Sequence, residues 1–266
     1  MQKAQVLGCA LALGMGAVSF SYAADGDFSV GTGFNYSTGK YGASQETRIV
    51  SIPFSARYET DKWLLKATVP WLSVTSPANV IPGIGSFDNS GRGGSGRRRS
   101  FAGTQTESGL GDATLSATYT AFYDEDARRG LDLTGRLKLP TADSDKGLGT
   151  GSTDESMQVD LYQSVDRLTL FGDVGYTNFG HSDVVELKNA VNYGVGLSNK
   201  IGDDDSVGVS YDARQKASVG GAPQRELTAF WNHHLARATK LQAYVLKGFA
   251  QGSPDFGFGV SALFGF

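Results

Sequence analysis

The sequence predicts an all-β protein: a single transmembrane antiparallel β-barrel of about 12 strands, with short periplasmic turns and longer extracellular loops. Three observations support this fold class. About twelve segments alternate apolar and polar residues, and the connections between them alternate between short and long. The third observation is the segment 256–266 (FGFGVSALFGF), which has one aromatic face and one face of mostly glycine and serine.

Each strand is predicted from a period of two. In residues 27–37, for example, Phe28 and Val30 share one face, whereas Ser29 and Gly31 lie on the other. The same period predicts the remaining strands, in order, at 50–58, 63–71, 112–123, 131–139, 156–165, 168–176, 190–201, 206–214, 226–235, 240–249 and 256–266. In this order their apolar faces carry Val50, Ile52 and Phe54; Trp63, Leu65 and Val69; Leu115, Tyr119 and Ala121; Leu131, Leu133 and Leu137; Met157, Val159 and Leu161; Leu168, Leu170 and Val174; Val191, Tyr193 and Val195; Val207, Val209 and Tyr211; Leu227, Ala229 and Trp231; Leu241, Ala243 and Val245; and Phe256, Phe258 and Val260.

The connections fall into two classes. Polar turns such as ETDK, DR, GDDD and ARAT are short, and the longest loop is predicted at residues 74–108. Short turns on one rim and long loops on the other are typical of bacterial outer-membrane barrels. A soluble β-sandwich is the alternative, but its inner faces would have to meet in an apolar core and could not be so rich in glycine.

The N-terminal residues 1–23 are predicted to be a secretory signal peptide. Lys3 precedes an uncharged, largely apolar run, and Ser21 and Ala23 occupy the small-residue positions of a cleavage site. Cys9 gives a weaker alternative, a lipoprotein signal. The predicted mature barrel, 24–266, contains no cysteine, so it is expected to reach the outer membrane of a Gram-negative bacterium through the periplasm without disulfides.

Composition excludes other classes. No window approaches the ~20 apolar residues of a membrane-spanning helix. The net charge of −3 argues against nucleic acid as a partner. In lipid every backbone polar group must be paired, so the last strand is expected to close on the first. Phe266, with Phe264 two residues before it, resembles the C-terminal signature that the barrel-assembly machinery recognises.

The inner face is the candidate functional surface, because charges facing lipid cost ~2–4 kcal/mol for Lys or Arg at the midplane. Six basic and six acidic residues are expected there, with two glycines of a bare seam between the first and last strands. Pairing of Lys138 with Asp112 and Asp160 would stiffen one wall; a purely structural salt-bridge ladder, with no role in selectivity, is an equal alternative. Bulk added at the seam would narrow the lumen. The predicted lumen-lining residues are Arg57, Lys66, Asp112, Asp132, Arg136, Lys138, Asp160, Asp173, Lys200, Asp212, Arg214, Glu226, Gly31 and Gly259.

The loop 74–108 has an apolar front and a basic rear. The apolar part is expected to drop into the mouth of the barrel, and the arginines to bind lipopolysaccharide phosphates. A solvated loop is an equal alternative. The apolar residues are Val80, Ile81, Ile84 and Phe87, and the basic cluster is Arg92, Arg97, Arg98 and Arg99.

Catalytic, cofactor-binding and metal-binding residues are not predicted. A nucleophilic serine needs a neighbouring histidine base. His233 is followed two residues later by Leu235, His234 is expected to point inward beside Asn232, and His181 lies in a loop. GLGTG lacks the Lys-Ser/Thr that completes a phosphate loop.

Two stretches resemble an outer-membrane barrel family. ESGLGDATLSATYTAF (107–122) and LKLPTADSDKGLGTGSTDESMQVDL (137–161) are similar to the family named for the meta-pathway of phenol degradation. The resemblance implies an outer-membrane transporter, linked in some relatives to aromatic compounds, with no catalytic residues to carry over.

The sequence therefore favours a porin-like channel in which small molecules, hydrophobic or aromatic ones among them, cross the outer membrane by passive diffusion. The alternative is a non-conducting surface barrel whose loops bind lipopolysaccharide or a protein partner.

Overall fold

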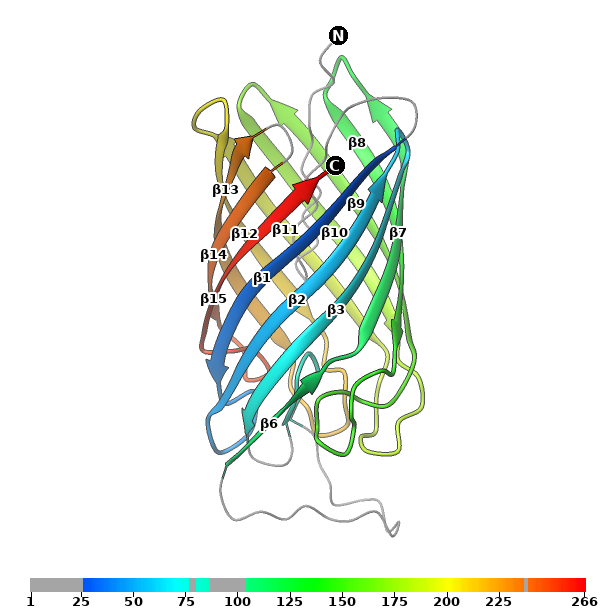
Figure 1. Cartoon of the computed structure of the whole chain (residues 1–266), viewed down its shortest axis with the longest axis vertical. Helices are drawn as coiled ribbons and strands as arrows, with labels where there is room; N and C mark the ends of the chain where they lie inside the picture. Colours follow the sequence, from blue (N-terminus) through cyan, green and yellow to red (C-terminus); the bar gives the residue numbers. More distant parts are fainter. Residues whose placement is uncertain (1–25, 77–79, 87–103, 237–238) are drawn as a thin grey trace.

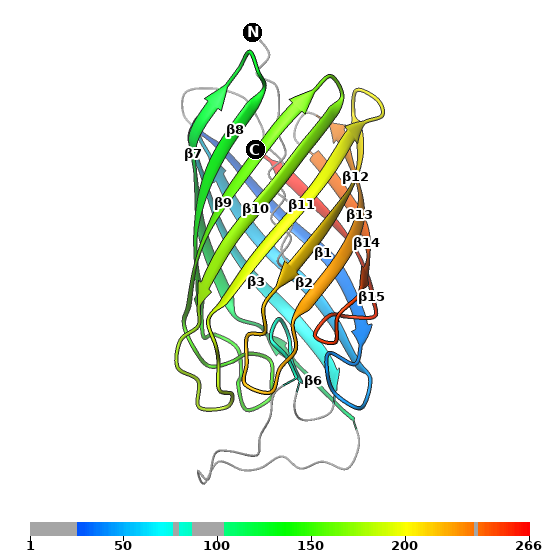
Figure 2. The same cartoon turned by 180° about the vertical axis from the view of Figure 1, so that it is seen from behind.

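The computed structural model describes residues 26–76, 80–86, 104–236 and 239–266, and it confirms the predicted fold class. Twelve antiparallel strands form a closed barrel (Figures 1 and 2). The described residues contain no helix that could cross a membrane. The strands of the wall are β1 (Asp27–Gly39), β2 (Thr47–Glu59), β3 (Trp63–Ser76), β7 (Ala113–Asp124), β8 (Arg129–Leu139), β9 (Asp154–Val165), β10 (Leu168–Asn178), β11 (Ala190–Lys200), β12 (Asp205–Arg214), β13 (Gln224–Ala236), β14 (Thr239–Gly248) and β15 (Phe256–Gly265).

Three shorter strands complete the architecture. β6 (Gln105–Leu110) precedes β7 and pairs with the C-terminal part of β3, from Trp71 to Ser76, whereas β7 pairs with its N-terminal part. β4 (Val80–Ile81) and β5 (Gly85–Ser86) form a small hairpin. Strands therefore occupy both ends of the predicted loop 74–108. The predicted signal peptide, 1–23, lies outside the described residues, as do Phe87 and the four arginines of the basic cluster.

The barrel closes between β1 and β15, as the sequence predicts. Their register runs from Ser29 opposite Gly265 to Thr38 opposite Phe256. One further bond extends it, because the Phe266 amide donates to the Phe28 carbonyl at 2.9 Å. Figure 1 shows the blue β1 beside the red β15. The closure leaves neither strand with an unpaired edge, which is what a β-structure needs in lipid.

The alternation is interrupted at two places: β13 shifts its register with β14 between His234 and Ala236, and β7 carries a bulge. The register with β8 shifts between Thr120 and Phe122, so Ala121 is the extra residue. Phe122, rather than the expected Ala121, takes the next outward position opposite Leu131, and half of its surface is exposed. A bulge of one residue reverses a period-two pattern, and the sequence pattern carried no sign of it.

The two rims differ as expected. The short-turn rim consists of residues 60–62, 125–128, 166–167 and 201–204, and lies at the top of Figure 1. The long-loop rim lies at the other end of the barrel. It consists of residues 40–46, 140–153, 179–189, 215–223 and 249–255, together with the β4–β5 hairpin.

The outer face is apolar and exposed. Phe54 is 55% exposed, Val195 60% and Val260 53%. Exposed apolar residues of this kind occur along the strands around the whole wall, far beyond the patch that a soluble monomer shows. Such a belt is suited to contact with lipid acyl chains.

A charge placed on this belt should destabilise the barrel according to its depth. Val195 lies in the middle of β11, whereas Val165 is the last residue of β9 at the short-turn rim. We expect Val195→Arg to lower the free energy of unfolding in lipid bilayers by ~2–4 kcal/mol and Val165→Arg by about 0–1 kcal/mol. Denaturant titration of the refolded variants measures both. Equal losses at the two sites would contradict the proposed placement in the membrane.

Candidate functional site

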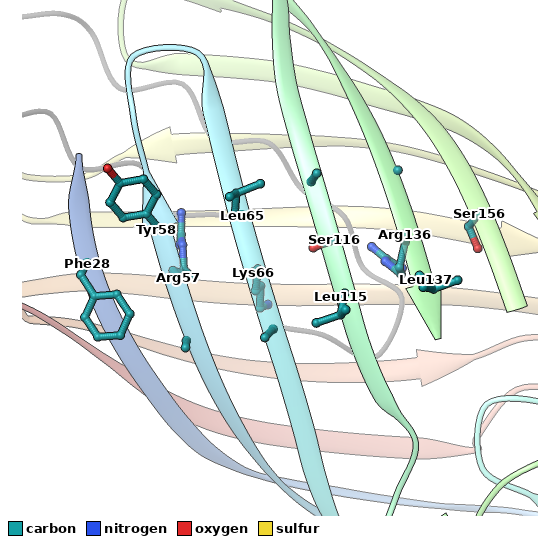
Figure 3. Close-up of a pocket in the computed structure, with 14 residues that line it drawn as sticks. Phe28, Arg57, Tyr58, Leu65, Lys66, Leu115, Ser116, Arg136, Leu137 and Ser156 are labelled. Atoms are coloured by element: carbon teal, nitrogen blue, oxygen red, sulfur yellow. The ribbon is translucent and has the colours of Figure 1, made fainter. Parts of the chain in front are cut away.

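The interior face is built from rows of residues that lie directly opposite one another on neighbouring strands. A basic row begins near the short-turn rim. Arg57 on β2 faces Lys66 on β3, Lys66 faces Ser116 on β7, and Ser116 faces Arg136 on β8. Figure 3 shows these four residues along neighbouring strands. Arg57 also forms an ion pair with Glu59, with Nη2 3.2 Å from Oε2, and both side chains are largely buried.

An acidic row follows from β8 to β13. Asp132 faces Asp160, Asp160 faces Asp173, and after Gly194 on β11 the row continues with Asp212 opposite Glu226. The row runs from the short-turn end of β8 to the long-loop end of β13.

Neutral side chains donate hydrogen bonds to the acidic row. Gln158 Nε2 lies 2.7 Å from Asp160 Oδ1, and Ser210 Oγ lies 2.9 Å from Asp212 Oδ2. Like charges directly opposite one another are unfavourable. The arrangement therefore places five carboxylates along one wall without the alternation of sign that a salt-bridge ladder requires.

Lys138 is the centre of a different contact, at the long-loop rim. Its Nζ lies 2.8 Å from Asp112 Oδ2, 2.9 Å from Asp154 Oδ2 and 2.7 Å from Thr150 Oγ1. The expected partner Asp112 is present, but Asp154 takes the place expected for Asp160. Sequence analysis began that strand at residue 156 and so missed Asp154.

This cluster ties two loops to the wall. Asp112 Oδ1 accepts from the Ala142 amide, and Asp154 Oδ1 accepts from Ser152 Oγ and the Gly180 amide. The contacts hold the start of loop 140–153 and that of loop 179–189. We therefore assign a structural role to Lys138: it holds the loops of the rim to the wall, and it does not line the open part of the lumen.

Other interior charges lie near the rims. Lys200 ends β11 at the short-turn rim and is exposed. Arg214 ends β12 at the opposite rim, where its Nη2 donates to the Gly83 carbonyl at 2.5 Å. Lys240, near the short-turn rim on β14, was missed by sequence analysis, although its alternation with Leu241 indicates an inward position; it is only 4% exposed.

The β4–β5 hairpin spans the mouth at the long-loop rim. Arg214 holds Gly83, the Ser86 amide donates to the Tyr41 carbonyl at 2.9 Å, and Ser218 Oγ donates to the Ser86 carbonyl at 3.2 Å. The hairpin therefore contacts both the β1–β2 loop and the β12–β13 loop. These bonds support the expectation that the apolar front of the loop drops into the mouth.

Apolar contacts fix the hairpin further. Val80 packs in a buried cluster with Tyr41, Ile49 and Leu72, and Ile81 and Ile84 pack with Val185 and Ala217 in a second cluster. The Tyr41 hydroxyl donates to Ser37 Oγ at 2.6 Å. Burial raises the pKa of Tyr41 well above its usual value, so the phenol stays neutral in this contact.

The glycine seam is not bare, contrary to the sequence-based expectation. A Cβ on Gly259 would lie 2.5 Å from the Tyr244 ring and would also overlap Asn35 Oδ1. A Cβ on Gly31 would lie 2.9 Å from Ser55 Oγ. A tryptophan at either position would therefore disturb the wall before it narrowed the lumen.

Inward aromatic rings cover glycines at several positions of the wall. Four such pairs are direct cross-strand neighbours, and in each the ring occupies the space that a Cβ would need. The interior along β8 to β15 is therefore filled by side chains of the wall strands. The pairs are Tyr162 with Gly130, Phe171 with Gly196, Phe230 with Gly208, and Tyr244 with Gly259.

A groove of about 640 Å³ crosses the same wall as the basic row. Its lining includes the exposed side chains of Phe28, Tyr58, Leu65 and Leu115 (Figure 3). The small residues Ala56, Ala67 and Ala117 also line it, as do the four residues of the basic row. We interpret it as a shallow depression in the apolar belt, where large side chains surround small ones.

His233 and the GLGTG segment have structural contacts. His233 Nδ1 lies 3.0 Å from Asp205 Oδ1, and its ring stacks on Trp231. Within GLGTG (147–151), Leu148 is buried among apolar residues and Thr150 binds Lys138. Among the described residues no group of three or more His, Cys, Asp and Glu could hold a metal ion.

The comparisons with known proteins identify the fold. No family model and no curated protein matches the sequence. An outer membrane channel from Pseudomonas putida F1 is similar in structure, with a TM-score of 0.70 and 15% identity over 93% of this chain and 98% of that one. The NanC porin gives a TM-score of 0.54 and 9% identity over 89% and 98%. The beta domain of the Bordetella autotransporter Brka gives 0.53 and 11% over 91% and 99%.

Removal of the Lys138 ammonium should weaken the long-loop rim, because Asp112 and Asp154 would lose the cation that both of them contact. We expect Lys138→Met to lower the free energy of unfolding by about 1–3 kcal/mol. Lys146→Met is the matched control: its ion pair with Asp143 spans 3.8 Å and both side chains are nearly half exposed, so its loss should change little. Thermal unfolding followed by heat-dependent gel mobility compares the two. Equal stability of both variants would show that the Lys138 cluster does not stabilise the rim.

Proposed function

We propose that the protein is a channel of the bacterial outer membrane through which small molecules pass by passive diffusion. The observation that carries the proposal is a closed twelve-stranded wall, apolar outside and lined by charged rows inside. Eight strands give a barrel that its own side chains fill, and sixteen give an open pore. Twelve strands therefore leave room for a narrow aqueous path.

Buried polar atoms support a hydrated interior. Arg57 Nε and Asp132 Oδ1 have no hydrogen-bond partner among the described residues, although both are shielded by the protein. Buried polar atoms in proteins are nearly always satisfied by protein or water. Water in the lumen would satisfy both atoms.

The similar structures support the proposal without deciding it. Two of them are a channel and a porin by name, whereas a third is the barrel of an autotransporter, so the same fold serves different purposes. The resemblance to the phenol meta-pathway family extends the proposed solutes to hydrophobic or aromatic molecules. The assignment to a transporter rather than an enzyme is part of this proposal.

We place the short-turn rim in the periplasm and the long-loop rim outside the cell, after export through the periplasm. The basic cluster of the long loop would then face lipopolysaccharide, and Phe266 would serve recognition by the barrel-assembly machinery. Phe266 is 82% exposed and its ring lies 6.4 Å from that of Phe28.

One observation favours the alternative, a non-conducting surface barrel that binds lipopolysaccharide or a protein. The β4–β5 hairpin is held across the mouth by three hydrogen bonds and two apolar clusters. Such a hairpin either narrows an aqueous path or closes it. A conductance measurement distinguishes a narrowed path from a closed one.

We expect the refolded protein to give discrete channel steps in planar bilayers. Replacement of residues 80–86 by a Gly-Ser segment should raise the conductance of each step severalfold, because it removes side chains from the mouth. Replacement of the turn 201–204 is the control and should leave conductance unchanged. Heat-modifiable gel mobility verifies folding. Absence of steps from both the native protein and the hairpin variant would contradict the channel proposal and favour the surface barrel.

A further inference from the structure

Between the two rims, most interior charges of the barrel are segregated by sign around its circumference. The exceptions are Glu59, which pairs with Arg57 on β2, and, at the rims, Lys200 on β11, Arg214 on β12 and the Lys138 cluster. Basic side chains occupy one arc, on β14, β2, β3 and β8, and carboxylates occupy the other, from β8 to β13. β15, β1 and β7 complete the basic arc of the wall. The basic arc contains Lys240, Arg57, Lys66 and Arg136; the acidic arc contains Asp132, Asp160, Asp173, Asp212 and Glu226.

Local ion pairs do not cancel this segregation. Ion pairs of the interior face include those of Arg57 with Glu59 and of Lys138 with Asp112 and Asp154, which lie outside the acidic row. The five carboxylates of the acidic row take their hydrogen bonds from neutral donors such as Gln158, Asn192 and Ser210. Arg136 attracts Asp160 and Asp173, and Arg214 attracts Glu226. The remaining repulsion within this row is left to be offset across the lumen or by its contents.

The geometry brings the two arcs to the same depth. Lys66 lies three residues from the short-turn end of β3, and Asp160 lies five residues from the short-turn end of β9. Arg136 lies in the middle of β8, four residues beyond Asp132 on the same strand. A solute on its way through the lumen would therefore have cationic groups on one side and carboxylates on the other.

We propose that these arcs make the channel selective for small dipolar solutes, which carry one cationic and one anionic group, over neutral solutes of the same size. The inference rests on the proposed channel function and, among its proposed solutes, favours dipolar molecules over neutral hydrophobic or aromatic ones. Low-dielectric walls focus the field of their charges into an aqueous path. A zwitterion can place its ammonium toward the acidic arc and its carboxylate toward the basic arc, so both of its charged groups are attracted by the wall.

Solutes of other kinds are stabilised less by the charges of the lumen. A neutral molecule has no charge to place. An ion of either sign is attracted by one arc and repelled by the other, so the two arcs partly cancel. The arrangement therefore predicts only weak selectivity between simple cations and anions, together with a clear preference for dipolar molecules.

Swelling of proteoliposomes tests the preference with β-alanine and lactamide, which are isomers of the same formula. β-Alanine is a zwitterion at pH 7, whereas lactamide is neutral; protein-free liposomes give the background rate for each. We expect β-alanine to enter about threefold faster than lactamide, or more. The double variant Asp160→Asn/Asp173→Asn should abolish this preference. Asp203→Asn/Asp204→Asn removes the same charge from a short turn and should keep it.

Reversal potentials in a salt gradient give a second measurement. Neutralisation of Asp160 and Asp173 should shift selectivity toward anions, and Lys66→Gln/Arg136→Gln should shift it toward cations. Equal entry of both isomers, unchanged in the aspartate variant, would overturn the inference and leave the channel itself in place. Absence of protein-dependent swelling and of channel steps would overturn both proposals together.

Discussion

The structure depends on one constraint: a β-sheet in a hydrocarbon layer has no water with which to satisfy its backbone. The pairing of β1 with β15 meets this constraint, because it gives the edge of the first strand the same partners as any strand inside the sheet. Closure divides the side chains into two sets. One set must suit lipid, and the other is enclosed. The apolar belt and the charged interior are consequences of that division.

The same division explains what the sequence could predict. Period two, the even strand count and the contrast of turn lengths follow from a closed two-faced wall, and each is visible in a single chain. Cross-strand partners depend on register, which a lone sequence does not state. Asp154 replaces Asp160 beside Lys138 for this reason. Gly259 looked like open wall because the Tyr244 ring that covers it belongs to the neighbouring strand.

The filled and charged parts of the interior complement each other. Aromatic rings seated on glycines fill space along β8 to β15, and the β4–β5 hairpin occupies the mouth. The remaining path would run between Lys66 and Arg136 on one side and the acidic row on the other. Like charges opposite one another along the row are unfavourable in a folded protein unless nearby cations, water or solute stabilise them. The proposed function gives a physical reason for their presence.

Accessibility of single cysteines tests the central claim, an enclosed aqueous lumen, most directly. The only cysteine of the sequence, Cys9, lies in the predicted signal peptide, so the barrel gives no background. Cysteines at Asp173 and Asn192 face the interior, and those at Val174 and Val195 face lipid. In proteoliposomes we expect a charged, membrane-impermeant thiol reagent to modify the first pair and spare the second. Protection of all four, or equal reaction of all four, would contradict the account.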